Sequence, residues 1–213
     1  MKLRQTFSKG AWLPTSLSKK GMPSLEDLGS LFPAQDGQLT ASVAVLGLDG
    51  SGKSSLVNRF ASGSWEEDLD PTIEAKYDRQ VSFEEGIEIH FRVLDTVESI
   101  ERLGAVDEFP ESRTCNVIVV NVTKRDSLEW AKKKLAIYAE ATCILVGSQA
   151  DVSPREVSFE ECVALAEEAD VPYIETSAKD NIRVNDAFVL ALQHHIAKKA
   201  PECGAGAGKC TIA

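Results

Sequence analysis

A glycine-rich segment around residue 50 has the residue types and spacing of a phosphate-binding loop. Its sequence, Gly47-Leu48-Asp49-Gly50-Ser51-Gly52-Lys53-Ser54, matches the pattern G-x-x-x-x-G-K-[S/T] at every fixed position. Glycines let backbone N–H groups turn toward phosphate oxygens, and a helix beginning here would add partial positive charge. Lys53 places a cation on the β- and γ-phosphates, and Ser54 offers a hydroxyl to Mg²⁺. The segment predicts a nucleoside triphosphate site, with a glycine-rich turn that binds nothing as the alternative.

Two residues further along the chain could complete a magnesium site. Asp95 ends an apolar stretch, which is where the second carboxylate motif of phosphate-loop proteins holds Mg²⁺ through water. Thr72 follows Pro71, and its hydroxyl could close on Mg²⁺ and the γ-phosphate. Without the phosphate loop, the Pro-Thr pair would indicate only a turn. Together with the loop, Ser54, Thr72 and Asp95 predict the metal ligands.

The elements that must position these residues alternate along the chain. Short apolar or alternating stretches predict strands at residues 42–46, 75–83, 88–95, 115–122, 143–147 and 173–175. Periodic stretches predict helices at residues 53–61, 128–139, 158–169 and 184–199. Ser158 and Glu161 predict a capping box for the third of these helices. This order predicts an α/β fold with a mostly parallel sheet and helices on both faces.

Length and composition exclude several other classes of protein. The 213 residues suit one domain with short tails, and a hydrophobic content of 43% is ordinary for a globular chain. The net charge of −10, from 23 Lys and Arg against 33 Asp and Glu, makes nucleic acid a poor general partner. The five cysteines include no Cys-x-x-Cys pair, which argues against a zinc site or a disulfide scaffold.

The composition divides the chain into three segments. Residues 1–40 contain scattered proline, serine and glycine, and we expect a disordered extension there. The domain should span residues 41–199, and residues 200–213 should form a flexible tail. No acidic residue precedes Glu26, so an organelle-targeting sequence stays open as an alternative. The leucines of residues 25–32 have helical spacing and could pack on the domain or form a docking motif.

The chain resembles the Ras-like small GTPases over residues 42–199. The segments that carry the resemblance are Gly47–Ser54, Asp70–Glu74 with Tyr77, Asp95-Thr96, Ser148–Asp151 and Thr176–Lys179. The resemblance implies a guanine-nucleotide-binding domain with a six-stranded sheet, which binds GTP or GDP with Mg²⁺. It also implies a monomer that binds effector proteins through the segment from Asp70 to Tyr77. An exchange factor and an activating protein are further implied partners.

The resemblance also assigns the residues that would bind the base. Asp151 can accept both N–H groups of the guanine edge, which adenine lacks. Ser148 and Gln149 stand where the family usually has Asn-Lys, although the Rho branch carries Thr-Gln or Thr-Lys there. Trp65 matches an aromatic that covers the edge of the guanine, with a surface hydrophobe as the alternative. The expected nucleotide contacts are Asp49, Gly50, Ser51, Gly52, Lys53, Ser54, Ser55, Trp65, Thr72, Ser148, Gln149, Asp151, Ser177, Ala178 and Lys179.

The residues expected to cleave GTP depart from the family pattern. The family usually reads Asp-x-x-Gly-Gln, whereas this chain reads Asp95-Thr96-Val97-Glu98-Ser99. Lys53 and Thr72 are expected catalytic residues, but Ser99 is too short to orient the attacking water as glutamine does. Asp49 replaces a glycine beside the γ-phosphate. We therefore expect slow hydrolysis; a non-hydrolysing GTP-bound scaffold and a phosphate-loop kinase or ATPase are the alternatives.

The last four residues, Cys210-Thr211-Ile212-Ala213, match the C-a-a-X pattern for prenylation, and a terminal alanine favours a farnesyl group. One lipid gives only marginal membrane binding, so a second signal is needed. Cys203 could carry a palmitoyl group, and a few lysines near the tail form a thin basic patch. We expect the protein at the cytoplasmic face of the plasma membrane or an endomembrane, with the cytoplasm as the alternative.

Overall fold

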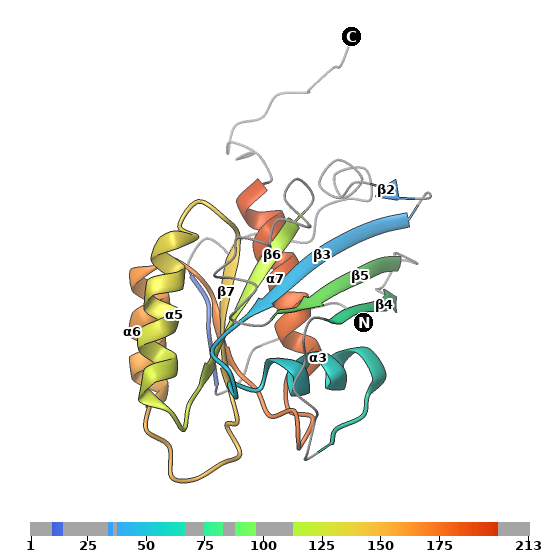
Figure 1. The fold of residues 1–213 in the computed structure, drawn as a ribbon. Coiled ribbons are helices and arrows are strands. Elements are labelled where there is room, and N and C mark those ends of the chain that lie inside the picture. The colour runs from blue at the N-terminus through green and yellow to red at the C-terminus, as the bar shows by residue number, and fades with distance from the viewer. Residues whose placement is uncertain are drawn as a thin grey trace.

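The fold is built from strands that alternate with helices (Figure 1). The structure is a computed structural model, and it describes residues 10–14, 34–35, 38–66, 75–82, 88–96 and 113–199. The strands are β1 (Ala11–Trp12), β2 (Ala34–Gln35), β3 (Gln38–Leu46), β4 (Ala75–Ser82), β5 (Glu88–Asp95), β6 (Arg113–Asn121), β7 (Cys143–Ser148) and β8 (Tyr173–Glu175). The helices are α3 (Lys53–Ser62), α5 (Arg125–Ile137), α6 (Phe159–Glu168) and α7 (Val184–Lys199).

The strands form one sheet in the order β1-β8-β7-β6-β3-β5-β4, and β2 pairs with β3. The central pairs β3–β5, β3–β6, β6–β7 and β7–β8 are parallel, whereas β4–β5 is antiparallel. The predicted mostly parallel α/β fold is therefore confirmed. The six strands that we predicted correspond to β3 through β8, and β1 and β2 extend the sheet.

Helices cover both faces of the sheet, and each face buries its own apolar cluster. Residues of α3 and α7 pack against one face, where the Phe60 and Phe188 rings stack with their centroids 3.8 Å apart. Residues of α5 and α6 pack against the other face. Figure 1 shows α5 and α6 side by side there. Because both faces are covered, the central strands carry continuous apolar runs, and every residue of β7 is buried.

The capping box predicted for α6 is present. The Ser158 hydroxyl accepts a hydrogen bond from the backbone N–H of Glu161 at 3.2 Å, and the Glu161 carboxylate accepts from the Ser158 N–H at 2.9 Å. Cys115, Cys143 and Cys162 are buried, and none of them forms a disulfide within the part of the chain that the structure describes. Among the described residues, none of the helices has both the length and the apolar character that a membrane span requires.

The N-terminal segment differs from the sequence-based expectation. We expected residues 1–40 to be a disordered extension, but β1, β2 and the start of β3 fall within this range. Trp12 packs toward the cluster under α5 and α6, whereas Ala11 and Leu13 pack toward the cluster under α3 and α7. This alternation is that of a strand between two covered faces. The run is too short to stand out in the sequence.

Candidate functional site

The predicted site residues follow the carboxyl ends of neighbouring strands. The phosphate loop follows β3, Asp95 ends β5, Ser148 ends β7, and the segment Thr176–Lys179 follows β8. These strands are parallel, so their carboxyl ends lie along one edge of the sheet. Open α/β sheets bind ligands at this edge.

The phosphate loop has the backbone geometry that its glycines predict. Gly50 and Gly52 have φ angles of 70° and 86°, in the left-handed region, and Gly52 is the N-cap of α3. A Cβ on Gly47 would lie 2.6 Å from the Ser51 hydroxyl oxygen and 2.9 Å from the Val119 carbonyl oxygen. Glycine is therefore favoured at residues 50 and 52 by backbone conformation and at residue 47 by the lack of space for a side chain.

Lys53 lies inside the loop rather than in solvent. Its side chain is buried, and its Nζ donates hydrogen bonds to the carbonyl oxygens of Gly47 at 2.8 Å and Leu48 at 2.9 Å. These two carbonyls hold the ammonium group against the loop. The cation is thus positioned before any phosphate arrives, as a phosphate-binding lysine requires.

Two residues beside the phosphate loop were missed in the sequence. The Asn121 side chain donates a hydrogen bond to the Gly50 carbonyl oxygen at 3.2 Å and accepts one from the Thr123 N–H at 2.9 Å. The Lys124 Nζ lies 3.4 Å from the position that a Cβ on Gly50 would occupy. Asn121 is the last residue of β6 and Lys124 follows that strand, so their place beside the loop comes from the parallel pairing of β6 with β3 and not from a motif.

Asp95 and Ser54 have the chemistry of a magnesium site. Asp95 is completely buried, and it pairs in register with Val45 on the strand that leads into the phosphate loop. Ser54 lies in the first turn of α3, directly after Lys53. A carboxylate and a hydroxyl are hard oxygen donors, which suit Mg²⁺ when phosphate and water complete its shell. The charge of Asp95 also reaches Tyr77, whose pKa is raised first by burial and then by this carboxylate.

The segment after β7 is joined to the phosphate loop by Ser148. The Ser148 hydroxyl donates to the Ser51 carbonyl oxygen at 2.5 Å, and it lies 3.2 Å from the Val120 carbonyl oxygen. Gln149 has a positive φ of 58°, and Asp151 is exposed. The N–H of Ala150 donates to the Thr176 carbonyl oxygen at 3.2 Å. The two segments expected to bind the base are therefore connected to each other and to the phosphate loop.

Arg59 of α3 holds the loop formed by Ser177, Ala178 and Lys179, which we call the base loop. Its Nε donates to the Ala178 carbonyl oxygen at 2.7 Å, and its Nη2 donates to the Lys179 carbonyl oxygen at 2.9 Å. Within the turn, the Ser177 hydroxyl accepts a hydrogen bond from the Asp180 N–H at 3.0 Å. The sequence offered no signal for Arg59 beyond a cation in the last turn of a helix.

Trp65 lies beside the base loop, as its assignment to the base requires. The Lys179 ammonium nitrogen is 5.5 Å from the centroid of the Trp65 ring. Trp65 as a whole residue is partly exposed. An aromatic ring beside the base loop can contact the face or the edge of a nucleobase.

Comparison with known proteins agrees with this geometry. The profile of the Ras family matches residues 42–197. The chain belongs to the Ras family. It is 30% identical over 156 residues to Ras-like protein 1 of Saccharomyces cerevisiae, across 68% of this chain and 49% of the yeast protein, so it spans about half the length of that relative. It is 32% identical over 168 residues to Ras-related protein O-RAL of Diplobatis ommata, across 75% of this chain and 81% of that protein.

Several predicted residues of this Ras-family chain lie outside the described residues. They are Thr72 and most of the effector segment from Asp70, Glu98 and Ser99 of the segment expected to cleave GTP, and the tail cysteines Cys203 and Cys210. Tyr77, at the end of the effector segment, lies on β4 and is partly buried. The structure therefore brings together the described residues that we predicted to bind phosphate and base, and the roles of all these residues stay predictions.

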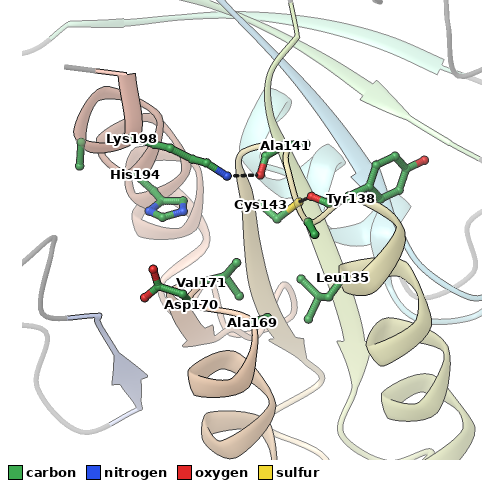
Figure 2. A pocket seen from close by; sticks show the side chains of 11 residues that line it. Leu135, Tyr138, Ala141, Cys143, Ala169, Asp170, Val171, His194 and Lys198 are labelled. Atoms are coloured by element: carbon green, nitrogen blue, oxygen red, sulfur yellow. Dashed lines mark hydrogen bonds between the residues drawn. The ribbon is translucent and has the colours of Figure 1, made fainter. Parts of the chain in front are cut away.

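A pocket of about 260 Å³ lies elsewhere in this Ras-family fold, where α5, α6 and α7 end and β7 begins (Figure 2). Leu135, Cys143 and Val171 form apolar parts of its lining, and His194 and Lys198 line it from α7. The residues lie toward the amino end of β7, whereas the phosphate and base segments follow the carboxyl ends of the strands. The pocket therefore does not belong to the candidate nucleotide site.

Proposed function

We propose that this Ras-family protein binds GTP and GDP together with Mg²⁺ and works as a membrane-anchored signalling switch. The observation that carries the proposal is the 2.5 Å hydrogen bond from the Ser148 hydroxyl to the Ser51 carbonyl oxygen. It joins the segment that would read the base to the loop that would hold the phosphates. Both halves of a nucleotide site therefore share one framework.

Each half of the site has a distinct task in this proposal. Lys53 neutralises charge on the β- and γ-phosphates, with its ammonium group already oriented by two loop carbonyls. Ser54 and Asp95 would hold Mg²⁺, which supplies further positive charge to the phosphate oxygens. The Asp151 carboxylate accepts the N–H groups of the guanine edge. Arg59 fixes the backbone of the base loop so that its N–H groups can meet the guanine carbonyl.

A protein that binds GTP without cleaving it is the second candidate, and Asp49 favours it. This carboxylate is exposed on the phosphate loop, where it adds negative charge near an anionic ligand. The sequence of residues 95–99 also lacks the glutamine that orients water in the family. A weak GTPase and a GTP-bound scaffold would both bind effectors through the segment from Asp70 to Tyr77. They differ in whether an exchange factor and an activating protein can complete a cycle.

The membrane anchor in this proposal is a farnesyl group on Cys210. The tail follows α7, which ends at Lys199. Lys198 donates a hydrogen bond to the Ala141 carbonyl oxygen at 2.8 Å, so its charge is partly directed toward the protein. The basic patch is correspondingly thin, and a palmitoyl group on Cys203 would be the stronger second signal.

The nucleotide carried by the purified protein tests the proposal. We expect GDP or GTP in the extract of denatured protein, and GTP rather than ATP should compete for the site at equilibrium. Asp151→Asn should shift preference toward xanthine nucleotides, because an amide N–H can face the carbonyl that xanthine has in place of the guanine amino group. Asp170→Asn, at an exposed position with a φ of 50° that asparagine tolerates, is the matched control. ATP binding as tight as GTP binding would contradict the assignment.

A further inference from the structure

The N-terminal strand β1 lies beside the base loop although it is outside the residues matched by the family. The match begins at residue 42, whereas β1 is Ala11–Trp12. Antiparallel pairing places Ala11 opposite Ile174 and Trp12 opposite Tyr173 on β8. On its other side, β8 pairs with β7. Strand β1 therefore covers the edge of the short strand that leads directly into the base loop.

Gly10 binds Glu175, the last residue of β8, two residues before the base loop. Its carbonyl oxygen accepts a hydrogen bond from the Glu175 N–H at 2.9 Å. The next residue, Thr176, donates from its N–H to the Gly147 carbonyl oxygen at 2.7 Å. The two residues that lead into the base loop are thus hydrogen-bonded on two sides. Thr176 bonds to β7, and Glu175 bonds to the N-terminal segment.

Gly10 also lies against Arg183, the residue that follows the base-loop turn. The turn is closed by two hydrogen bonds between Ser177 and Ile182, of 3.1 Å and 2.9 Å, and Arg183 follows it. A Cβ on Gly10 would lie only 2.2 Å from Arg183 Nη1, and Gly10 has a φ of 114°. Only glycine fits this close approach without strain. Gly10 therefore contacts residues on both sides of the turn that carries the base loop, Glu175 before it and Arg183 after it.

Side chains fasten this segment to both faces of the sheet. Trp12 is half-buried and packs against the apolar cluster that contains Tyr173. Ala11 and Leu13 pack against the opposite cluster, and Pro14 is buried. The pairing of β1 with β8 is only two residues long, so burial of these side chains should contribute most of the free energy that keeps β1 on the sheet.

We propose that residues 10–14 form a positioning clamp that keeps the base loop in its nucleotide-binding place. Lifting β1 away from β8 removes the hydrogen bond to Glu175 and the contact with Arg183, and the loop can then move away from the base. Nucleotide dissociation becomes faster as a result. The inference rests on the proposed function, in which the base loop holds guanine.

The dissociation rate of a fluorescent GDP analogue, mant-GDP, from the full-length protein tests the clamp. Direct excitation of the mant group avoids energy transfer from the tryptophans. We expect Trp12→Ala to raise the rate at least fivefold, and Trp12→Phe, which keeps an aromatic ring, to stay within twofold of wild type. Trp130→Ala is the matched control, because Trp130 is also a partly buried tryptophan but lies on α5. It should lower thermal stability comparably without changing the rate beyond twofold.

Amide hydrogen exchange supplies a second measurement that general destabilisation does not reproduce. In the GDP-bound protein, Trp12→Ala should speed exchange at Glu175 and Ser177, and Trp130→Ala should not. If Trp12→Ala fails to fold, Gly10→Ala carries the same prediction, because alanine is strained at the Gly10 φ of 114° and its methyl group would displace the Arg183 guanidinium.

The outcomes separate the clamp from the function on which it rests. Equal dissociation rates for the Trp12 and Trp130 variants, with unchanged exchange at Glu175, would overturn the clamp while guanine-nucleotide binding stands. A wild-type protein that binds no mant-GDP would overturn the proposed function and the clamp together.

Discussion

The ammonium group of Lys179 lies over the ring of Trp65, 5.5 Å from the ring centroid. The two residues come from distant parts of the chain, Trp65 from just beyond α3 and Lys179 from the base loop after β8. Arg59 accounts for their proximity, because it reaches from α3 to the carbonyl oxygens of Ala178 and Lys179. The base side of the site is thus assembled by contacts between α3 and the loop, in addition to the strand ends.

Replacing Trp65 by alanine should weaken nucleotide binding at the base. An edge-on contact between aromatic rings is worth about 0.5–1.5 kcal/mol, so we expect GDP dissociation to rise about 2- to 13-fold. Trp65→Phe should lie between wild type and Trp65→Ala. The rates can be measured by chasing mant-GDP with excess GDP. Unchanged release from Trp65→Ala would mean that Trp65 is only a surface hydrophobe.

The sequence predicted the parts of this site that depend on local patterns. The phosphate loop follows from its own motif, because the glycine backbone, Lys53 and Ser54 act within one continuous segment. The sheet follows from apolar runs that are buried on both faces, as at β7. Asp95 could be placed because it ends such a run. These predictions need only the order of the elements along the chain.

The parts that were missed depend on contacts between distant segments. Arg59 and Asn121 hold the site through hydrogen bonds to backbone carbonyls, for which no side-chain pattern exists. The role of Ser148 as a link to the phosphate loop is likewise visible only in the structure. Strand β1 was expected to be disordered, because a two-residue pairing has too few residues to show a period. Its partner, β8, is far away in the sequence.

The stability of the protein should fall below pH 6.5 in part because of His194. This histidine is buried, and its pKa is lowered to about 4 by burial first and then by the charges of Lys198 and His195. The unfolded chain takes up a proton near pH 6.5, whereas the folded chain does so only near pH 4. Between these values the free energy of unfolding should fall by at most about 1.4 kcal/mol per pH unit.

Urea unfolding at several pH values can measure this contribution. His194→Gln removes the titrating group, so its loss of stability between pH 7 and pH 4.5 should be smaller than that of the wild type by about 2–3 kcal/mol. Comparing the two proteins at each pH cancels the carboxylates that also titrate in this range. Parallel curves for the two proteins would show that His194 does not contribute.

Replacement of Cys210 by serine should make the protein soluble in cells, because serine cannot carry a prenyl group. Fractionation of wild type and variant should place only the wild type with membranes. Cys203→Ser should give partial release if Cys203 carries the second lipid. Mass spectrometry of the native protein that finds an unmodified C-terminus ending in Ala213 would contradict the anchor. That result would favour the targeting role of residues 1–40.

Intrinsic GTP hydrolysis by this protein should be slower than is usual in the Ras family. Activating proteins should increase its rate only a little. The reaction requires an oriented water, a hydrogen-bond donor to the γ-phosphate and space for an arginine from the activating protein. In the positions that the family pattern assigns to them, Ser99 would be too short to orient the water, and Glu98 and Asp49 would place negative charge beside an anionic phosphate. Each change could raise the barrier by about 1–3 kcal/mol.

Variants at these three positions can show whether the changes act together. All three residues are expected to act on one small volume around the γ-phosphate, so the increases in the activation barrier that they cause should not simply add. Ser99→Gln alone should recover little activity, because the two carboxylates remain. The triple variant Asp49→Gly, Glu98→Gly, Ser99→Gln should recover most of it in a single-turnover assay with bound GTP. A wild-type rate equal to that of a typical Ras-like protein would refute the prediction. Another group would then have to orient the water, and residues 100–111 are the nearest candidates in the chain.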